Sequence, residues 1–299
     1  KNPRHHKFYH NFLLFLGFLT ITLNRSQKAK KTSIYYMKLF NFLAPLIVIT
    51  LLSCGHHRNT VKNILPRDSF LKIQKTIEAT MCHPKKKDLC VTKRFGATAS
   101  GAVVNVTGNG AYVLTAAHVC IDEKAKKFLN KVQHKMFFYV INIESTYFPV
   151  EIIATDQLND LCILYVEGLR NPAMRIAVNK PVPGDRVYNL AAPLGIFDKD
   201  MIPTFQGFYN GDTRIYDRAI YTLPAKGGSS GSPIMNHRGE LVGMVSAAFI
   251  RFSHLAISPK FKETTTFVET IVDSDRRKRN LAAVADFINK IFNKAKSKP

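Results

Sequence analysis

The chain has 299 residues and a formal net charge of +22, and 46% of its residues are hydrophobic, including 21 Phe and 11 Tyr. This composition can build a sizeable core and excludes a wholly disordered protein, and the length suits about two domains. Aromatic residues are not interleaved with the basic runs and no nucleic-acid-binding motif appears, so we predict a solvated basic surface and no nucleic-acid partner.

Two apolar runs come first along the chain. The run at residues 12–23 is about half as long as a helix needs to be to cross a bilayer. The second run follows Met37 and Lys38, covers residues 39–52, and leads into Ser53 and Cys54. A short basic start, an apolar centre and a small residue before the cut are the parts of an export signal. We therefore predict a signal peptide over residues 37–53.

The end of this predicted signal, Leu51-Leu52-Ser53-Cys54, resembles the lipobox of bacterial lipoproteins. The resemblance implies cleavage before Cys54 and lipidation of that cysteine, hence an exported lipoprotein anchored to a membrane of the bacterial cell envelope, facing the periplasm or the exterior. The alternatives are an ordinary cleavable signal or an uncleaved anchor, with Cys54 incidental. Because Met37 is the first methionine, we expect residues 1–36 to be an upstream or non-structural extension.

Residues 54–92 are predicted to form a linker and an N-terminal helix. Residues 58–67 are mostly polar, and Asp68 or Ser69 can cap a short helix that follows them. The apolar face of that helix would carry Phe70, Leu71, Ile73 and Ile77.

Four cysteines remain besides Cys54, and export would permit them to form disulfide bonds. They are Cys82, Cys90, Cys120 and Cys162. Four cysteines allow three pairings, among which a sequence cannot choose. A bond between Cys82 and Cys90 would close a small loop, and Cys120 and Cys162 each follow a candidate catalytic residue, which favours their proximity. Buried free thiols are the alternative for the latter two.

A β-hairpin is predicted next, and it presents a histidine. Residues 97–106 favour a strand, Asn109-Gly110 favours a tight turn, and residues 112–116 favour a second strand. The hairpin leads into Thr-Ala-Ala-His, which ends at His118. An imidazole can take up a proton near neutral pH and release it again, so His118 is a candidate general base. The alternative is a structural histidine.

Asp160 is the candidate partner of His118. It directly precedes an apolar strand predicted over residues 161–166. A carboxylate at the mouth of such a strand can accept a hydrogen bond from the histidine and fix its tautomer. Asp156 is the rival candidate and Asp122 a weaker one.

The candidate nucleophile is Ser230, within the sequence K-G-G-S-S-G-S-P at residues 226–233. Glycines around a serine allow the backbone to approach a substrate closely, so that amide groups reach the substrate oxygen. The backbone amides of Gly228 and Ser230 are the candidate oxyanion-hole donors. The alternative is an ordinary Gly/Ser loop.

The chain order His, Asp, Ser is that of the chymotrypsin fold and not of subtilisins or α/β-hydrolases. Three further stretches resemble the protease domain of bacterial HtrA-type enzymes, a trypsin-like group of serine peptidases. Residues 184–195 look like the strand and turn that open the second barrel, residues 239–249 like the strand after the nucleophile, and residues 255–271 like the last strand and helix. The resemblance implies an all-β fold of two packed six-stranded β-barrels with short flanking helices and a C-terminal helix, over residues 93–272.

The same resemblance implies a serine endopeptidase that acts on a protein or peptide substrate. His118, Asp160 and Ser230 would be its catalytic residues. It also implies substrate-binding residues, namely Ala225, Ser246, Ala247 and Ala248, the last three pairing with the substrate backbone. Pro224 stands where trypsin-like enzymes select basic side chains with a carboxylate, so we expect a preference for small or medium apolar side chains and not for Lys or Arg.

The chain also departs from the HtrA pattern. Ser229 and Ser232 stand where the family usually has Asn and Gly, and no PDZ domain is expected in the sequence. One alternative function is therefore a catalytically inactive trypsin-like fold that binds peptides at the cell envelope, and another is a basic envelope protein that binds anionic polymers. No metal or organic cofactor is predicted, because the His and Cys spacings lack a full ligand set.

Residues 273–299 are predicted to form a basic hinge and a C-terminal amphipathic helix. The hinge would be the Arg/Lys run at residues 276–279. One apolar face of the helix would carry Leu281, Val284, Ile288 and Ile291. We expect that face to pack on the second barrel, with contact to a membrane surface as the alternative.

Overall fold

The computed structural model describes residues 65–83, 86–121, 127, 129–249 and 251–296, and for residues 86–88 and 291–296 it describes the backbone only. The predicted extension at residues 1–36, the export signal at residues 37–53 and the candidate lipidation site Cys54 lie outside the described residues. So does most of the predicted linker. The structure therefore bears on the chain from residue 65 onward.

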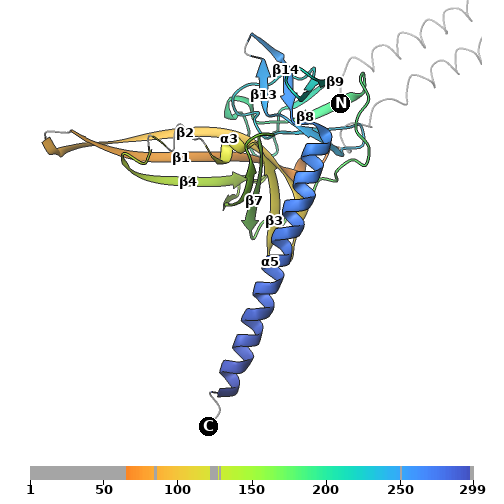
Figure 1. The fold of residues 1–299 in the computed structure, drawn as a ribbon. Helices are drawn as coiled ribbons and strands as arrows, with labels where there is room; N and C mark the ends of the chain where they lie inside the picture. The colour runs from red at the N-terminus through yellow and green to blue at the C-terminus, as the bar shows by residue number, and fades with distance from the viewer. Residues whose placement is uncertain (1–64, 84–85, 122–126, 128, 250, 297–299) are drawn as a thin grey trace, which may run out of the picture. The chain divides into compact units, whose positions relative to one another are not determined.

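The first barrel is built from one curled antiparallel sheet (Figure 1). In the described part of the chain this sheet has seven strands, in the order β5-β4-β1-β2-β3-β7-β6. The strands are β1 (Phe70–His83), β2 (Lys86–Val106), β3 (Gly110–Thr115), β4 (Gln133–Ile141), β5 (Tyr147–Pro149), β6 (Glu151–Asp156) and β7 (Leu161–Glu167). The predicted hairpin corresponds to the β2–β3 pair, and every residue of β3 is buried.

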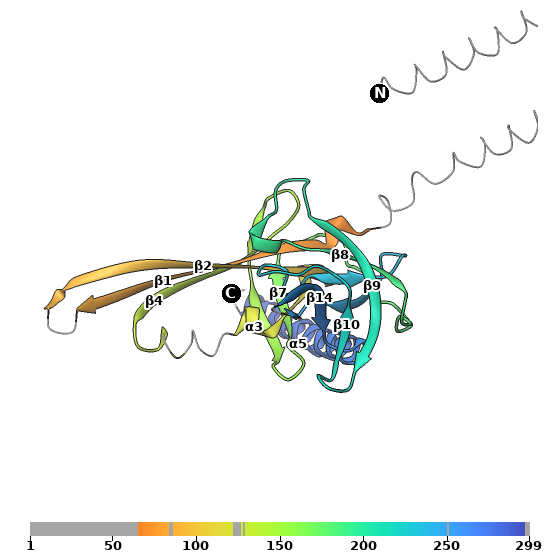
Figure 2. The ribbon, with the colours of Figure 1, turned by 90° about the horizontal axis from the view of Figure 1, so that it is seen from above.

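The second barrel is a similar antiparallel sheet, and Figure 2 labels several of its strands. Among the described residues it also has seven strands, in the order β12-β11-β8-β9-β10-β14-β13. They are β8 (Arg186–Leu190), β9 (Thr204–Thr213), β10 (Arg218–Tyr221), β11 (Pro233–Met235), β12 (Leu241–Met244), β13 (Ala247–Phe249) and β14 (Phe252–Ser258). The prediction of two packed β-barrels is confirmed, and each sheet has one strand more than the six expected.

A shared hydrophobic core joins the two barrels. It contains Tyr112 and Leu114 from β3, Leu190 from β8 and Met235 from β11, all of them fully buried or nearly so. Burial of an aliphatic or aromatic side chain stabilises a fold by about 1.5–3 kcal/mol, so these side chains fix the position of one barrel against the other. Separate apolar clusters fill the inside of each barrel.

The prediction of a helix after Asp68 and Ser69 is wrong. A single 3-10 turn, η1 (Arg67–Ser69), leads directly into β1. Residues 72–80 of β1 pair with β2 on one side and with β4 on the other. β-Branched residues such as Ile73 and Ile77 suit a paired strand better than a helix. The folded domain therefore begins at β1, upstream of the predicted boundary at residue 93.

β1, β2 and β4 continue beyond the barrel as a long projection on the left of Figure 1. We call this projection the arm, and it consists of residues 76–83, 86–96 and 133–137. Near its tip Cys82 and Cys90 face each other across the strand pair and form a disulfide bond. Apolar side chains on the arm remain exposed, including Val91 at 59% and Phe95 at 47%.

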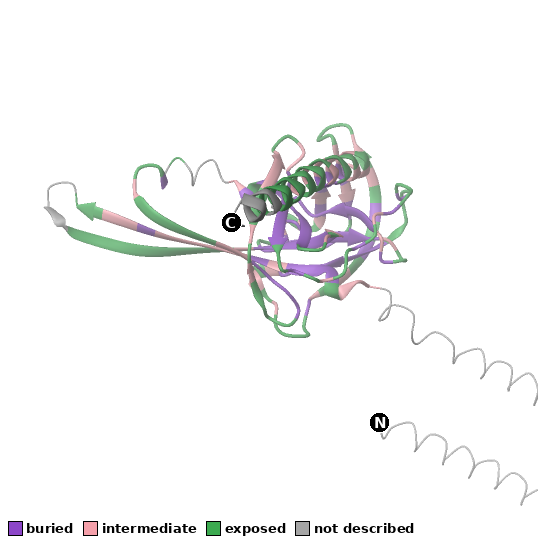
Figure 3. Cartoon of the chain, turned by 90° about the horizontal axis from the view of Figure 1, so that it is seen from below, coloured by how far each residue is buried: buried purple, intermediate pink, exposed green. Residues whose placement is uncertain are grey.

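The basic run at residues 276–279 is not a hinge, because a single helix, α5 (Phe261–Lys296), passes through it unbroken. Val268 and Val272 bury the first part of α5 against the shared core. From residue 280 to 290 every residue is exposed (Figure 3), so the expected packing on the second barrel is also wrong. Within the described residues no helix is both long and apolar enough to span a membrane.

Candidate active site

His118 lies on α3 (Ala117–Cys120), a single helical turn that follows β3. Its backbone N–H donates a hydrogen bond to Oδ1 of Asp160 over 3.0 Å. Its side chain is half exposed, with 51% of its surface accessible. The hydrogen bond to Asp160 therefore fixes the backbone of His118, while about half of its side chain remains accessible to solvent.

Asp160 occupies the end of the turn between β6 and β7, where its φ of 58° places it in the left-handed region. Both carboxylate oxygens lie 3.0 Å from Nδ1 of His118. Oδ2 also accepts a hydrogen bond from Oγ of Ser246 over 2.5 Å. The rival Asp156 is used elsewhere, because it accepts hydrogen bonds from the backbone and side-chain amides of Asn159, and Asp122 lies outside the described residues.

The ionisation of Asp160 follows from these contacts. Burial raises the pKa of its carboxyl group, but the hydrogen bonds from His118 and Ser246 and the charge of a protonated His118 outweigh burial and hold the pKa below its ordinary value. Asp160 is thus a carboxylate at neutral pH. A carboxylate at this position keeps the proton of a neutral imidazole on Nδ1 and leaves the Nε2 lone pair free to accept a proton.

Ser230 stands on the opposite side of His118 from Asp160. Its Oγ lies 2.9 Å from Nε2 of His118, so the structure brings the three predicted residues into one hydrogen-bonded chain. The loop needs its glycines. At Gly228, with a φ of 96°, an added Cβ would lie 2.3 Å from the carbonyl oxygen of Ala192, and at Gly231, with a φ of 84°, it would lie 2.1 Å from that of Ser100.

The two predicted oxyanion donors lie in this loop. Among the described residues, neither the Gly228 nor the Ser230 backbone N–H donates a hydrogen bond to another protein group. Amides that the protein leaves without an acceptor in a loop of this kind are suited to binding an anionic oxygen.

Ser100 of β2 fastens the loop to the first barrel, and sequence reasoning missed it. Its backbone N–H donates to the carbonyl of Ser230 over 2.8 Å, and its Oγ donates to the carbonyl of Gly228 over 2.8 Å. The same Oγ accepts a hydrogen bond from the Ala192 amide over 3.0 Å. The available signal was a serine among the small and apolar residues near the end of β2, because a hydroxyl buried there requires hydrogen-bond partners.

Two further contacts hold the turn that carries His118. Cys120 and Cys162 form a buried disulfide bond, and each lies two residues after a candidate catalytic residue. Nζ of Lys75 donates hydrogen bonds to the carbonyls of Val119 and Cys120, over 3.3 and 3.1 Å. Those carbonyls lie at the C-terminal end of α3, where a cation is favoured. The His118 segment is thus tied both to β7 and to β1.

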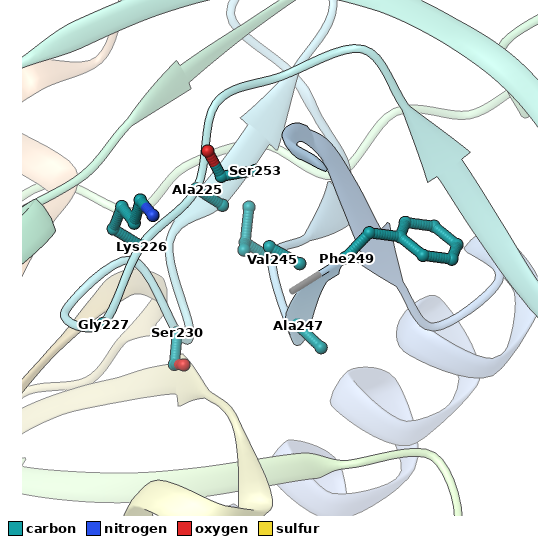
Figure 4. Close-up of a pocket in the computed structure, with 9 residues that line it drawn as sticks. Ala225, Lys226, Gly227, Ser230, Val245, Ala247, Phe249 and Ser253 are labelled. Carbon is teal, nitrogen blue, oxygen red and sulfur yellow. The ribbon is translucent and has the colours of Figure 1, made fainter. Parts of the chain in front are cut away.

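A pocket of about 220 Å³ opens beside Ser230 (Figure 4). It is lined by Ala225, Lys226, Gly227, Ser230, Val245, Ala247, Ala248, Phe249 and Ser253. Three of the four predicted substrate-binding residues thus line it. Ser246 does not, because its side chain turns to Asp160 and its amide donates to the carbonyl of Ile257. Sequence reasoning did not single out Val245, Phe249 or Ser253. In the described part of the chain, no group of three or more His, Cys, Asp or Glu is placed to hold a metal ion.

Comparison with known proteins supports the fold. The chain is similar in structure to an HtrA-type protease, AlgW, solved with a decapeptide, with a TM-score of 0.54 and 16% identity over 72% of this chain and 67% of that one. It is also similar to the serine endoprotease from Yersinia pestis, with a TM-score of 0.50 and 19% identity over 72% of this chain and 65% of that one. At these identities the likeness concerns the fold alone. No curated protein matches the sequence.

A family model described as "Trypsin-like peptidase domain" matches residues 99–244. This range begins in β2 and ends with β12, and it contains His118, Asp160 and Ser230. Residues 99–244 of this chain therefore form a trypsin-like peptidase domain.

Proposed function

We propose that the protein is a serine endopeptidase that hydrolyses peptide bonds through an acyl-enzyme formed on Ser230. The observation that carries the proposal is the hydrogen-bonded chain from Asp160 through His118 to Ser230, with 3.0 Å at one end and 2.9 Å at the other. Each distance is within the range for a nucleophile, its base and the group that orients the base.

The proposed reaction begins when Oγ of Ser230 attacks the carbonyl carbon of the scissile peptide bond. The hydroxyl proton passes to Nε2 of His118, and Asp160 stabilises the imidazolium that forms. When the tetrahedral intermediate collapses, the C–N bond breaks and His118 gives the proton to the leaving amine. Water then attacks the ester with His118 again as the base, which releases the acid product and restores the Ser230 hydroxyl.

The negative charge of each tetrahedral intermediate would be bound by the backbone amides of Gly228 and Ser230. Removal of a single oxyanion donor in such sites costs about 10²–10³ in kcat. The free orientation of both amides and the tight turn at Gly228 support this assignment.

We further propose that the pocket of Figure 4 binds the substrate side chain that precedes the scissile bond. Its lining is mostly small and apolar, its one charged residue is Lys226, and no carboxylate contributes to it. A cationic side chain would find no counter-ion there, so apolar side chains of small or medium size are favoured over Lys and Arg. A peptide library cleaved strictly after Lys or Arg would contradict this specificity.

Labelling with a fluorophosphonate probe, which forms a covalent bond to an activated serine, tests the proposed function. We expect the parent protein to be labelled and Ser230→Ala to be unlabelled. Ser253→Ala is the matched control, because Ser253 lines the same pocket but has no hydrogen bond to His118 among the described contacts, and it should stay labelled. An unlabelled but folded parent protein would instead indicate the alternative, an inactive fold that binds peptides.

We also propose that the protein is exported and anchored to a membrane by lipidation of Cys54. The support is the sequence of residues 37–54, together with two disulfide bonds, which persist in oxidising compartments. Metabolic labelling of a bacterial host with a radioactive fatty acid should mark the parent protein and the Ser53→Ala control, and it should not mark Cys54→Ala. Equal labelling of parent and Cys54→Ala would overturn the assignment.

A further inference from the structure

The distal part of α5 carries an apolar stripe that nothing in the described part of the chain covers. We define the distal segment as residues 280–296. Its apolar side chains are exposed at Leu281 (71%), Val284 (56%), Phe287 (64%) and Ile288 (44%). All of residues 280–290 are exposed, as the outer surface of the helix in Figure 3 shows. Such a segment gains little helical stability from its own propensity, so a partner that covers the stripe would stabilise it.

The stripe does not continue the face by which α5 packs on the barrels. Successive residues of an α-helix are rotated by about 100°, which places Leu281 and Ile288 roughly half a turn around the helix from the buried Val272. The change of side occurs after Arg279, which is bound to the first barrel. Its guanidinium stacks on Tyr165, 3.8 Å from the ring centroid, and donates a hydrogen bond to Glu151 over 2.6 Å. The barrel therefore cannot cover the stripe, which faces away from it.

The charge around the stripe indicates what would cover it. Residues 276–299 contain eight Lys and Arg and a single acidic residue, Asp286, so this end of the chain has a net charge of +7. Three of the eight lie in the distal segment itself, and four form the basic run at residues 276–279 directly before it. Asp286 itself is paired with Lys290. An apolar stripe on a helix with a strongly basic polar face is the pattern of helices that lie in the interface of an anionic membrane. Lys and Arg near such a surface are each attracted by anionic lipid headgroups.

We propose that the distal segment of α5 binds the surface of an anionic lipid bilayer, with Leu281, Val284 and Ile288 entering the headgroup region. A second copy of the chain is a poorer partner, because two copies of this basic end, each with a net charge of +7 over residues 276–299, would repel each other when packed side by side. This surface is separate from the proposed active site and does not depend on lipidation of Cys54.

The chain contains no tryptophan, so a single introduced one reports only on its own position. In the full-length protein, Ile288→Trp places the indole on the stripe, and the control Asp286→Trp places it on roughly the opposite side of the helix. With vesicles that contain phosphatidylglycerol, we expect the fluorescence of Ile288→Trp to shift to shorter wavelength and that of Asp286→Trp to stay unchanged. Added salt should reverse the shift, and Leu281→Ser in the Ile288→Trp background should weaken it.

Any of three other outcomes would overturn the proposal. No shift with anionic vesicles would exclude membrane binding by the stripe. An equal shift with phosphatidylcholine alone would exclude the selection of anionic lipid. A shift without vesicles that grows with protein concentration would assign the stripe to self-association. Fluorophosphonate labelling of both tryptophan variants reports separately on the proposed active site, which lies on other elements of the fold.

Discussion

The two disulfide bonds of the described residues lie in contrasting regions of the first barrel. Cys120–Cys162 is buried, spans 42 residues of sequence, and joins the segments that carry His118 and Asp160. Cys82–Cys90 lies near the exposed tip of the arm and spans only 8 residues. The first bond fixes two segments far apart in the sequence, whereas the second closes a hairpin that its strand pairing already holds together.

The same contrast applies to charged and titratable side chains. Around α3 they meet several partners at once, as Lys75 and Asp160 do. On the arm they meet one partner in water, as in the ion pair of Glu78 with Arg94, whose side chain is 73% exposed. A charged group with several fixed partners is held in one position, whereas a single exposed ion pair contributes little to the stability of the fold. We therefore expect equal chemical changes in the two regions to have unequal effects.

The largest difference is expected between two histidines. His118→Ala removes the proposed base and should lower kcat/KM for a peptide substrate by on the order of 10⁴-fold or more. His134→Ala, on the arm, should leave kcat/KM within about twofold, because among the described contacts its ring is hydrogen-bonded to the carbonyl of Val132 and not to any candidate catalytic residue. Steady-state hydrolysis of one peptide by the three proteins measures both effects, and similar losses in the two variants would contradict the contrast.

The next largest difference is expected between the two disulfide bonds, in the free energy of unfolding that is lost when each is removed. In a chain-entropy model, the loss of a bond spanning 42 residues costs about 4 kcal/mol of unfolding free energy, and the loss of one spanning 8 costs about 2.5 kcal/mol. Denaturant unfolding of Cys120→Ala/Cys162→Ala and of Cys82→Ala/Cys90→Ala tests this order.

Activity should separate the same two variants more clearly. Displacement of His118 relative to Asp160 should lower kcat by about 10- to 100-fold in the first variant, and the second should retain the kcat of the parent. Should the first variant fail to fold, the parent protein treated with a reductant under native conditions provides the same comparison.

A smaller difference in kcat is expected between substitutions of two lysines. Lys75→Met removes the hydrogen bonds to the α3 carbonyls but keeps the aliphatic length that packs near Phe138, so kcat should fall by roughly tenfold, or about 1–2 kcal/mol. Lys93→Met changes an exposed lysine of the arm and should have no measurable effect on kcat. KM should be unaffected in both variants. A higher KM with an unchanged kcat in Lys75→Met would mean that Lys75 does not act through His118.

The smallest expected effects concern the change in the free energy of unfolding with pH. The folded-state pKa of Asp160 lies below its ordinary value of 3.8. Its ionised carboxylate therefore stabilises the fold at neutral pH, and this contribution disappears as the pH falls through 3.8 and below, where the unfolded chain takes up the proton first. The difference in unfolding free energy between the parent and Asp160→Asn should accordingly shrink in acid.

The arm provides the counterpart to that measurement. Glu78→Gln should cost no more than about 1 kcal/mol at neutral pH, because its ion pair with Arg94 is exposed, and added salt should remove the cost. A larger cost in Glu78→Gln than in Asp160→Asn would reverse the contrast between the two regions.

The three candidate residues that the structure brings together could be singled out from the sequence because each lies next to a strong local signal. His118 follows a hairpin with an Asn-Gly turn, Asp160 abuts an apolar strand, and Ser230 lies among glycines that the turn requires. The order of the three along the chain then indicated the two-barrel fold, which the structure has.

The errors arose where a distant part of the chain decides the local structure. Phe70, Leu71, Ile73 and Ile77 fit one face of a helix, but β2 and β4 supply backbone partners on both sides of this segment and make it a strand. The basic run at residues 276–279 suggested a hinge, whereas Arg279 is held by Glu151 and Tyr165 of the first barrel. The hydrogen bond from Ser246 to Asp160 likewise joins two barrels, and no spacing in the sequence encodes it.

The position of Ser100 has a consequence for biosynthesis. This residue is made early, and its hydroxyl and amide hold the loop of Gly228 and Ser230, which is made more than a hundred residues later. The folded form of the later loop thus includes two hydrogen bonds from the first barrel. On the proposed mechanism, we therefore expect the nucleophile to become active only once the second barrel has docked on the first.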